Sequence, residues 1–270
     1  MSIIPSPKWT LDLRDPRAPL QAVWDAMTDE ERREVVESLP SEFPPDEAHP
    51  PEGDHHFEAY SEARDILSRW FRERGRRVYV SGNLPVFYPG EHMFSPDVIA
   101  VLDVEPHPRP SWIVSHEGKG LDFALEVIVS GSRRKDVKDN VERYAQLGIG
   151  EYFVYDFTRR TLNGYRLKDD SYERAVPQGG AFHSAVLELG LRLEEGRLRF
   201  LVGNAVLPSQ KELVERLTHF VDDAQTRALE LEAALEEEQK RREEEQKRRE
   251  EAERELELVK AELERLKSNR

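Results

Sequence analysis

Two carboxylate residues occupy positions in this sequence where a negative charge is costly. Asp97 follows Pro96 and opens the apolar run 97–104, and Glu126 lies inside the run 123–129, which is otherwise apolar on both faces. A carboxylate in a buried strand is strongly unfavourable unless it is paired or binds a cation. On adjacent strands the two could share a hard cation such as Mg²⁺, which prefers oxygen ligands. The alternative is a structural ion pair with a nearby basic residue.

Further motifs accompany these carboxylates in a fixed order along the chain. They are Ser95-Pro96-Asp97-Val98, Leu125-Glu126-Val127, Ser130 with Arg133 to Asp136, Tyr144-Ala145, Leu147-Gly148-Ile149 and Glu151-Tyr152-Phe153. No single motif is decisive, but the ordered set closely resembles the putative restriction-endonuclease family of the PD-(D/E)XK nuclease superfamily over roughly residues 54–203. A highly charged coiled-coil tail, which this chain also carries, is common in that family.

The resemblance implies a restriction-endonuclease-like α/β (α+β) fold, with a central mixed sheet flanked by helices. It also implies a DNA endonuclease that hydrolyses phosphodiester bonds, with Asp97 and Glu126 holding Mg²⁺ or, in its place, Mn²⁺. A further acidic ligand often comes from the first core helix of the superfamily. Glu58 and Glu62 are the candidates here, although such residues are more often solvated surface groups. The alternative function is a catalytically silent nuclease-fold module that recruits a partner through its coiled coil.

The chain departs from the superfamily motif at the lysine that usually follows the strand glutamate by two residues. That position is Ile128, and the alternative lysine position on the following helix is Asn140. A lysine there would orient the attacking water and offset charge on the phosphate. The nearest substitutes are Lys135, which we take as the catalytic lysine, and Lys138. Lys138 lies about 200° around a helix from Asp136 and is expected to face water.

Other polar clusters fit their chemical motifs less well. His55 and His56 start a helix, where a histidine pair more often caps the helix or lies at the surface than binds zinc, and no matching ligand spacing is present. Residues 130–132 do not form a G-x-S-x-G elbow, and residues 117–120 lack the glycine spacing of a phosphate-binding loop. Serine hydrolases and nucleotide-binding folds are therefore disfavoured.

The overall charge restricts how the chain could meet DNA. The formal net charge is −14, whereas a basic surface is the usual sign of nucleic-acid binding. Any DNA contact must therefore be local. The candidate phosphate contacts are Arg133, Arg134 and Lys138, and a solvated loop is an equally consistent interpretation.

Apolar periodicity predicts the elements that position these residues. Residues 20–39 are predicted to form a helix, with Thr28 and Glu31 in capping-box spacing. The proline-rich segment 41–53 cannot continue this helix. Asp54 is expected to cap an amphipathic helix that ends near Gly75. This helix would be packed on the core.

Short runs typical of strands follow this helix. They lie at 78–80, 84–88, 97–104, 123–129 and 151–156. A helix from Asp136 to Gly148 separates the last two, and this order is typical of a right-handed crossover between parallel strands. Later runs at 161–167, 187–193 and 197–202 are expected at the edge of the sheet.

The tail has a separate, heptad-like pattern of seam positions. The apolar ones are Val214, Leu217, Val221, Ala224, Ala228, Leu231, Leu235, Ala252, Leu256, Val259, Leu263 and Leu266. The middle of the seam is charged, because EEEQKRR occurs at 236–242 and again at 243–249. Its Glu-to-base pairs contribute roughly 0.2–0.5 kcal/mol each, so the middle can be helical alone. The apolar ends predict self-association, most simply a homodimer with two active sites.

Composition sets the remaining expectations. Residues 1–53 are read as a helical arm and linker, 54–207 as the nuclease-like domain and 208–270 as the coiled-coil helix. Cysteine is absent, which excludes disulfide frameworks, thiolate zinc sites and cysteine nucleophiles. No run approaches the roughly 18 apolar residues of a membrane span, and the first residues lack a signal-peptide pattern. We therefore expect a cytoplasmic location.

Overall fold

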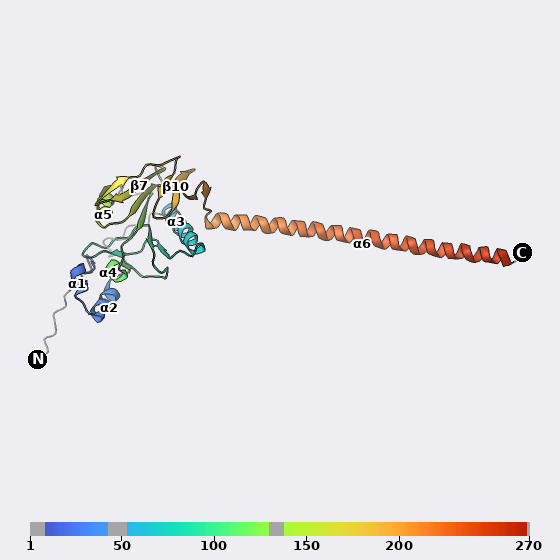
Figure 1. The fold of residues 1–270 in the computed structure, drawn as a ribbon, viewed down its shortest axis with the longest axis horizontal. Helices are drawn as coiled ribbons and strands as arrows, with labels where there is room; N and C mark the ends of the chain where they lie inside the picture. Colours follow the sequence, from blue (N-terminus) through green and yellow to red (C-terminus); the bar gives the residue numbers. More distant parts are fainter. Residues whose placement is uncertain (1–8, 43–52, 130–137, 269–270) are drawn as a thin grey trace. The chain divides into compact units, whose positions relative to one another are not determined.

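The computed structural model describes residues 9–42, 53–129 and 138–268 (Figure 1). The chain divides into two compact units, Met1–Gln210 and Lys211–Arg270. The first unit is a mixed α/β structure, and the second is formed by the long helix α6 (Gln210–Ser268), which begins at the boundary. No helix in the described ranges is long and apolar enough to cross a membrane.

A six-stranded mixed sheet forms the centre of the first unit, in the order β1-β3-β5-β6-β7-β8. Its strands are β1 (Val78–Ser81), β3 (Val98–Leu102), β5 (Phe123–Ile128), β6 (Glu151–Asp156), β7 (Thr161–Lys168) and β8 (Ser171–Arg174). Neighbours are antiparallel except β5 and β6, which run parallel with Leu125 opposite Phe153. The predicted mixed sheet and its parallel pair are confirmed.

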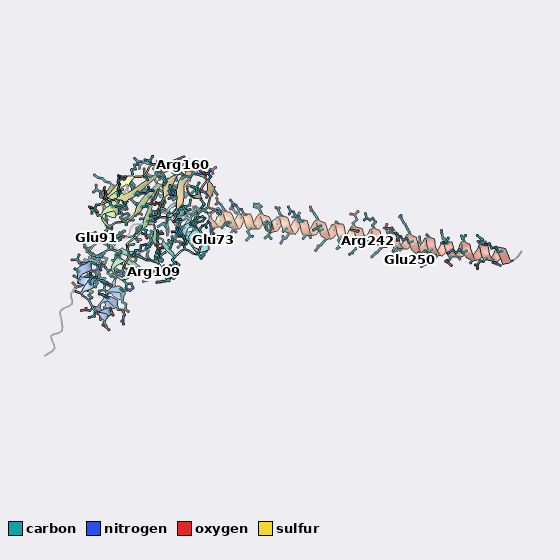
Figure 2. All side chains as sticks on the ribbon, in the orientation of Figure 1. Glu73, Glu91, Arg109, Arg160, Arg242 and Glu250 are labelled. Carbon is teal, nitrogen blue, oxygen red and sulfur yellow. The ribbon has the colours of Figure 1, made fainter. Side chains whose placement is uncertain are left out.

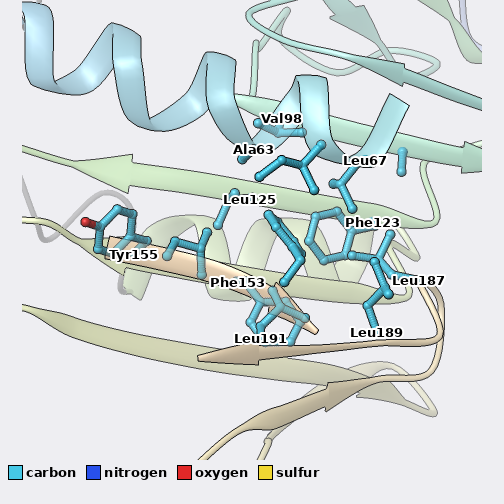
Figure 3. Packing of buried hydrophobic residues seen from close by; sticks show 14 of the residues in the cluster. Ala63, Leu67, Val98, Phe123, Leu125, Phe153, Tyr155, Leu187, Leu189 and Leu191 are labelled. Atoms are coloured by element: carbon cyan, nitrogen blue, oxygen red, sulfur yellow. The ribbon is translucent and has the colours of Figure 1, made fainter. Parts of the chain in front are cut away.

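Helix α3 (Asp54–Glu73) covers one face of this sheet (Figure 3). Its buried residues Ala63, Ile66, Leu67 and Phe71 recur every three or four positions, so they form one apolar stripe. They pack with Val98, Phe123, Leu125, Phe153 and Tyr155 from the strands. Burying a large apolar side chain contributes roughly 1.5–3 kcal/mol, which anchors the helix. The N-cap is Gly53 rather than Asp54, so the expected start was wrong by one residue.

Helix α5 (Asn140–Gln146) contributes to the core on the opposite face of the sheet. Its Tyr144 lies edge-on to Tyr152 of β6, with ring centroids 4.9 Å apart. The strand residues on this face include Tyr79, Ile99, Val101, Ala124, Ile128 and Val154. The expected cap, Asp136, lies outside the described residues. Gly148 follows the helix closely and has a positive φ of 75°, as expected for a helix stop.

The later strands form a second sheet instead of extending the edge of the first. The four-stranded sheet has the order β12-β11-β10-β9. Its strands are β9 (Phe182–Ser184), β10 (Leu189–Glu194), β11 (Arg197–Val202) and β12 (Ala205–Val206). Alternate residues Leu189, Leu191, Leu198 and Phe200 enter the same core cluster as α3, because successive strand side chains point to opposite faces. The edge placement predicted for 187–193 and 197–202 was therefore wrong.

The N-terminal helical segment is broken in two. The single helix expected over 20–39 is α1 (Gln21–Asp25) followed by α2 (Asp29–Ser38). Thr28 starts the second helix with a capping box, because its hydroxyl accepts from the Glu31 amide while the Glu31 carboxylate accepts from the Thr28 amide. The capping box was predicted, but the break that it makes was not.

These N-terminal helices pack on a small parallel pair, β2 (Val86–Phe87) and β4 (Trp112–Ile113), which leads into the short helix α4 (Val114–Glu117). The shared cluster contains Ala18, Trp24, Met27, Val35, Leu39, Phe87, Met93 and Ile113. Most of the proline-rich linker, 43–52, lies outside the described residues.

A buried carboxylate, Glu151, joins the two sheets and has a structural explanation. Only 2% of this residue is exposed. Its carboxylate accepts from the Ser184 hydroxyl and from the Ala185 amide at 2.8 Å, and lies 3.2 Å from Nε of Arg166. Buried charge is tolerated where such donors surround it. Glu151 therefore fixes the start of β6 to the end of β9.

We expect Glu151→Gln to lower the free energy of unfolding by about 1–3 kcal/mol, because an amide nitrogen replaces one of the two accepting oxygens. Urea denaturation followed by circular dichroism measures the change. The matched control is Glu173→Gln, an exposed residue of β8. Equal stability of the two variants would show that the network does not hold the sheets together.

Candidate active site

The pairing of β3 with β5 brings Asp97 and Glu126 together. The two strands are antiparallel with Val98 opposite Leu125, and continuing this register by one residue sets Asp97 opposite Glu126. The Asp97 amide donates to Glu126 Oε2 at 3.4 Å. Asp97 is only 6% exposed, and Glu126 is partly buried. The structure thus places two carboxylates side by side on adjacent strands.

The Asp97 carboxylate is held through both of its oxygens. Oδ2 accepts from the Val127 amide at 2.7 Å, and Oδ1 lies 3.0 Å from Nε2 of His56. His56 belongs to the first turn of α3, and its side chain is largely buried. One contact comes from the sheet and the other from the helix above it, so the orientation of the carboxylate is set by two separate elements.

The Glu126 carboxylate is oriented by α5. Oε1 accepts from the Tyr144 hydroxyl at 2.9 Å and lies 3.5 Å from Nδ2 of Asn140, which is 4% exposed. Burial, and after it the nearby Glu126 charge, raises the pKa of Tyr144 well above its ordinary value. The phenol therefore stays protonated at neutral pH and acts as a hydrogen-bond donor.

The two positions where the superfamily motif usually carries its lysine, 128 and 140, are occupied by neutral side chains. Ile128 is buried in the core cluster that α5 joins, and Asn140 points its amide toward Glu126. Lys138 is exposed, as expected for a residue facing water. The other basic residues proposed for this region, Lys135, Arg133 and Arg134, lie outside the described residues.

Glu58 and Glu62, the candidate acidic metal ligands on α3, lie apart from the contact that α3 makes with Asp97. Glu62 Oε1 lies 3.9 Å from Nη1 of Arg199 on β11. Glu58 is exposed, two residues after His56 and so about 200° around the helix from it. The α3 side chain that contacts Asp97 is His56.

Sequence reasoning assigned His56 to the helix start and passed over its contact with Asp97. The neighbouring His55 stacks on Phe157 instead, with ring centroids 4.8 Å apart. A signal was present in the sequence, because His56 lies four residues before Tyr60 and seven before Ala63, on the face that packs inward. That stripe distinguishes His56 from His55, although it does not say which side chain His56 meets.

The donor set suits a hard divalent cation better than zinc. In the described ranges no three histidine, aspartate or glutamate side chains form a metal-binding group. Structural zinc requires four protein ligands and catalytic zinc usually three. Mg²⁺ keeps several of its waters and binds through one or two carboxylates together with substrate phosphate. Asp97 and Glu126 supply the two carboxylates that such a site would use.

Two comparisons found proteins to which this chain is similar. The model of the family described as "Uma2: Putative restriction endonuclease" matches residues 42–195, more than half of the chain and including both carboxylates. A solved structure described as a putative nuclease belonging to DUF820, from Anabaena variabilis, is 14% identical with a TM-score of 0.40, over 50% of this chain and 75% of that one. No curated protein matches. The chain belongs to the Uma2 family of putative restriction endonucleases.

Proposed function

We propose that this protein is a divalent-metal-dependent DNA endonuclease whose site is centred on Asp97 and Glu126. The observation that carries the proposal is the juxtaposition of Asp97 and Glu126, with the Asp97 amide 3.4 Å from Glu126 Oε2, within the segment that matches the family. Like charges brought together in a partly buried place repel each other, and a shared cation removes that cost. A magnesium ion is the proposed cofactor, with manganese as a substitute.

Each neighbour has a distinct role in this proposal. Asp97 and Glu126 hold the metal, which when bound supplies Lewis acidity and lowers the pKa of a coordinated water. His56 positions Asp97, since its imidazole reaches Oδ1 while a backbone amide holds Oδ2. Tyr144 and Asn140 position Glu126 from α5. The supporting side chains come from rigid elements, as a preorganised site requires.

The positive charge that phosphoryl chemistry needs is proposed to come from the segment before α5. Lys135 would stand near the scissile phosphate, and Arg133, Arg134 and Lys138 would contact neighbouring phosphates. Ile128 and Asn140 carry no charge at the usual positions of the catalytic lysine, so another residue would supply it. An ammonium close to a phosphate stabilises the charge that develops there.

The same two neutral residues support a second candidate function. A nuclease fold that lacks its lysine could bind DNA or another partner without cleaving it, and α6 would then recruit that partner. The discriminating observation is nicking of plasmid DNA in the presence of magnesium or manganese. DNA binding without nicking under either metal would favour this silent module.

Self-association through α6 is part of the proposal. The apolar seam positions from Val214 to Leu235 and from Ala252 to Leu263 are exposed in the single chain. Helices with such stripes pair because pairing removes the stripes from water. A homodimer is the smallest assembly that does so.

Asp97→Asn and Glu126→Gln should each weaken manganese binding at least about tenfold, roughly 1.4 kcal/mol, because each loses a ligand charge with little change of volume. Nicking should be lost with binding. Calorimetric titration of manganese measures the affinity, and circular dichroism checks the fold. The control is Asp169→Asn, an exposed turn residue. Wild-type affinity in either variant would place the metal elsewhere, and an unfolded variant would favour the structural ion-pair interpretation.

His56→Ala should weaken manganese binding about 10- to 100-fold, the effect typical of losing a residue that hydrogen-bonds a metal ligand, whereas His55→Ala should leave it unchanged. The two histidines are adjacent, but only His56 contacts Asp97. His56→Gln should recover part of the affinity, because its amide can donate to the same carboxylate. Equal affinities in all three variants would remove His56 from the site.

Lys135→Ala should reduce nicking at least about tenfold with manganese affinity retained, because the ammonium acts on the phosphate rather than on the metal. Lys138→Ala is the matched control and should have a much smaller effect, since that side chain is exposed. Single-turnover cleavage at saturating metal measures the difference. Equal rates in the two variants would overturn the role of Lys135.

A further inference from the structure

The long helix α6 carries an apolar stripe that no other described element covers. The large apolar seam side chains from Val214 to Leu263 are exposed, from 43% at Val221 to 71% at Leu231. Figure 2 shows the side chains of α6 projecting along its length, with Arg242 and Glu250 marked. A stripe of this kind at heptad spacing is the usual contact surface of a coiled coil. The residues along the seam should therefore indicate which helix pairs with α6 and in which orientation.

Four charged residues interrupt the apolar seam at its centre. They are Glu238, Arg242, Glu245 and Arg249, which alternate in sign. Within one helix they are already paired, with Arg242 Nη2 2.6 Å from Glu238 Oε1 and Arg249 Nη2 2.8 Å from Glu245 Oε1. The alternation discriminates between orientations, because residues on the seam of a coiled coil face the partner.

We infer that α6 pairs with a second copy of itself in antiparallel orientation, centred between Glu243 and Glu244. The inference rests on the self-association proposed above and adds its geometry. In this arrangement Arg242 faces Glu245 of the second copy. Glu238 likewise faces Arg249 of the second copy. All four charged layers are then complementary.

A parallel, in-register pair would have the opposite property. Each seam residue would face its own counterpart, so Glu238 would meet Glu238 and Arg242 would meet Arg242, through four successive layers of like charge. Like charges in a partly desolvated seam are strongly unfavourable. The charged centre of the seam therefore disfavours the parallel pair.

The apolar layers on either side favour the same orientation. The antiparallel register pairs small with large side chains: Ala224 with Leu263, Ala228 with Val259 and Ala252 with Leu235. Leu231 faces Leu256 in the remaining layer of this block. In the parallel register each of the three alanines would face another alanine, which leaves poorly filled layers. In the antiparallel register both the charges and the side-chain volumes of facing residues are therefore complementary, about the same centre between Glu243 and Glu244.

The positions that flank the seam favour the parallel pair, but only weakly. Opposite charges there would meet in parallel helices at Arg227 with Glu232, Arg248 with Glu253, Glu255 with Lys260 and Glu262 with Lys267. In the antiparallel register Arg227 meets Glu262, while Glu232 meets Glu253 and Arg241 meets Arg248. Exposed ion pairs contribute little and are screened by salt. Charges on the seam are less solvated and so interact more strongly, and we therefore take the seam charges to determine the orientation of the pair.

The orientation has a consequence for where the two helices begin. At 1.5 Å per residue, the two Gln210 residues, where the helices begin, would lie roughly 100 Å apart at opposite ends of the coil. A parallel pair would set them side by side. The points where the two chains pass from globular unit to helix would thus be far apart in an antiparallel dimer.

Disulfide crosslinking of the full chain tests the orientation, because the natural sequence has no cysteine. Ala228→Cys and Val259→Cys are prepared as separate chains with tags of different mass, mixed while reduced, and then oxidised. The antiparallel register sets these positions opposite each other, within disulfide reach. The mixture should crosslink at least about tenfold more than either variant alone. Lys240→Cys, on the outer face of the helix, is the matched control.

Two outcomes would overturn the inference: one contradicts only the antiparallel orientation, and the other contradicts self-association as well. Crosslinking of each variant with itself would show a parallel dimer and leave self-association intact. A monomer by light scattering at micromolar concentration, without crosslinks in any mixture, would overturn self-association together with the orientation. Neither outcome depends on nuclease activity, so neither bears on Asp97 and Glu126.

Discussion

The antiparallel pairing of β3 with β5 is the constraint on which the candidate site depends, because it sets Asp97 opposite Glu126. Two carboxylates in a partly buried place repel each other, so the surrounding structure must offset that repulsion. The described contacts do so with donors from three elements: β5 and α3 at Asp97, and α5 at Glu126. These donors set the orientation of the two carboxylates.

The two faces of the sheet have different parts in this arrangement. The cluster between α3, the central sheet and the second sheet fixes the helix that carries His56. The opposite cluster fixes Tyr144 of α5 against β6. Side chains alternate between the faces of a strand, so β5 buries Phe123, Leu125 and Val127 on one face and carries Glu126 between the buried Ala124 and Ile128 on the other. The site lies where the two clusters meet the ends of β3 and β5.

Buried carboxylates in this fold fall into two kinds, and their partners distinguish them. Glu151 accepts from a hydroxyl and an amide and lies beside an arginine, which explains its burial without a ligand. Asp97 and Glu126 instead lie opposite each other in the continued β3–β5 register. Glu126 accepts from the Tyr144 hydroxyl, while Asp97 accepts from the Val127 amide and lies 3.0 Å from Nε2 of His56. The contrast shows why burial alone does not single out a candidate functional acid, whereas a second carboxylate beside it does.

The sequence by itself determined the central mixed sheet, the parallel pair β5 and β6, and the long C-terminal helix, because each depends on a local period or a short connection. It also singled out Asp97 and Glu126, since an acid in an apolar run is visible without coordinates. Only the tertiary structure decided that the strands after Leu187 form a second sheet and that His56 contacts Asp97. Periodicity shows which face of an element is buried, but the surface that covers it comes from residues distant in the chain.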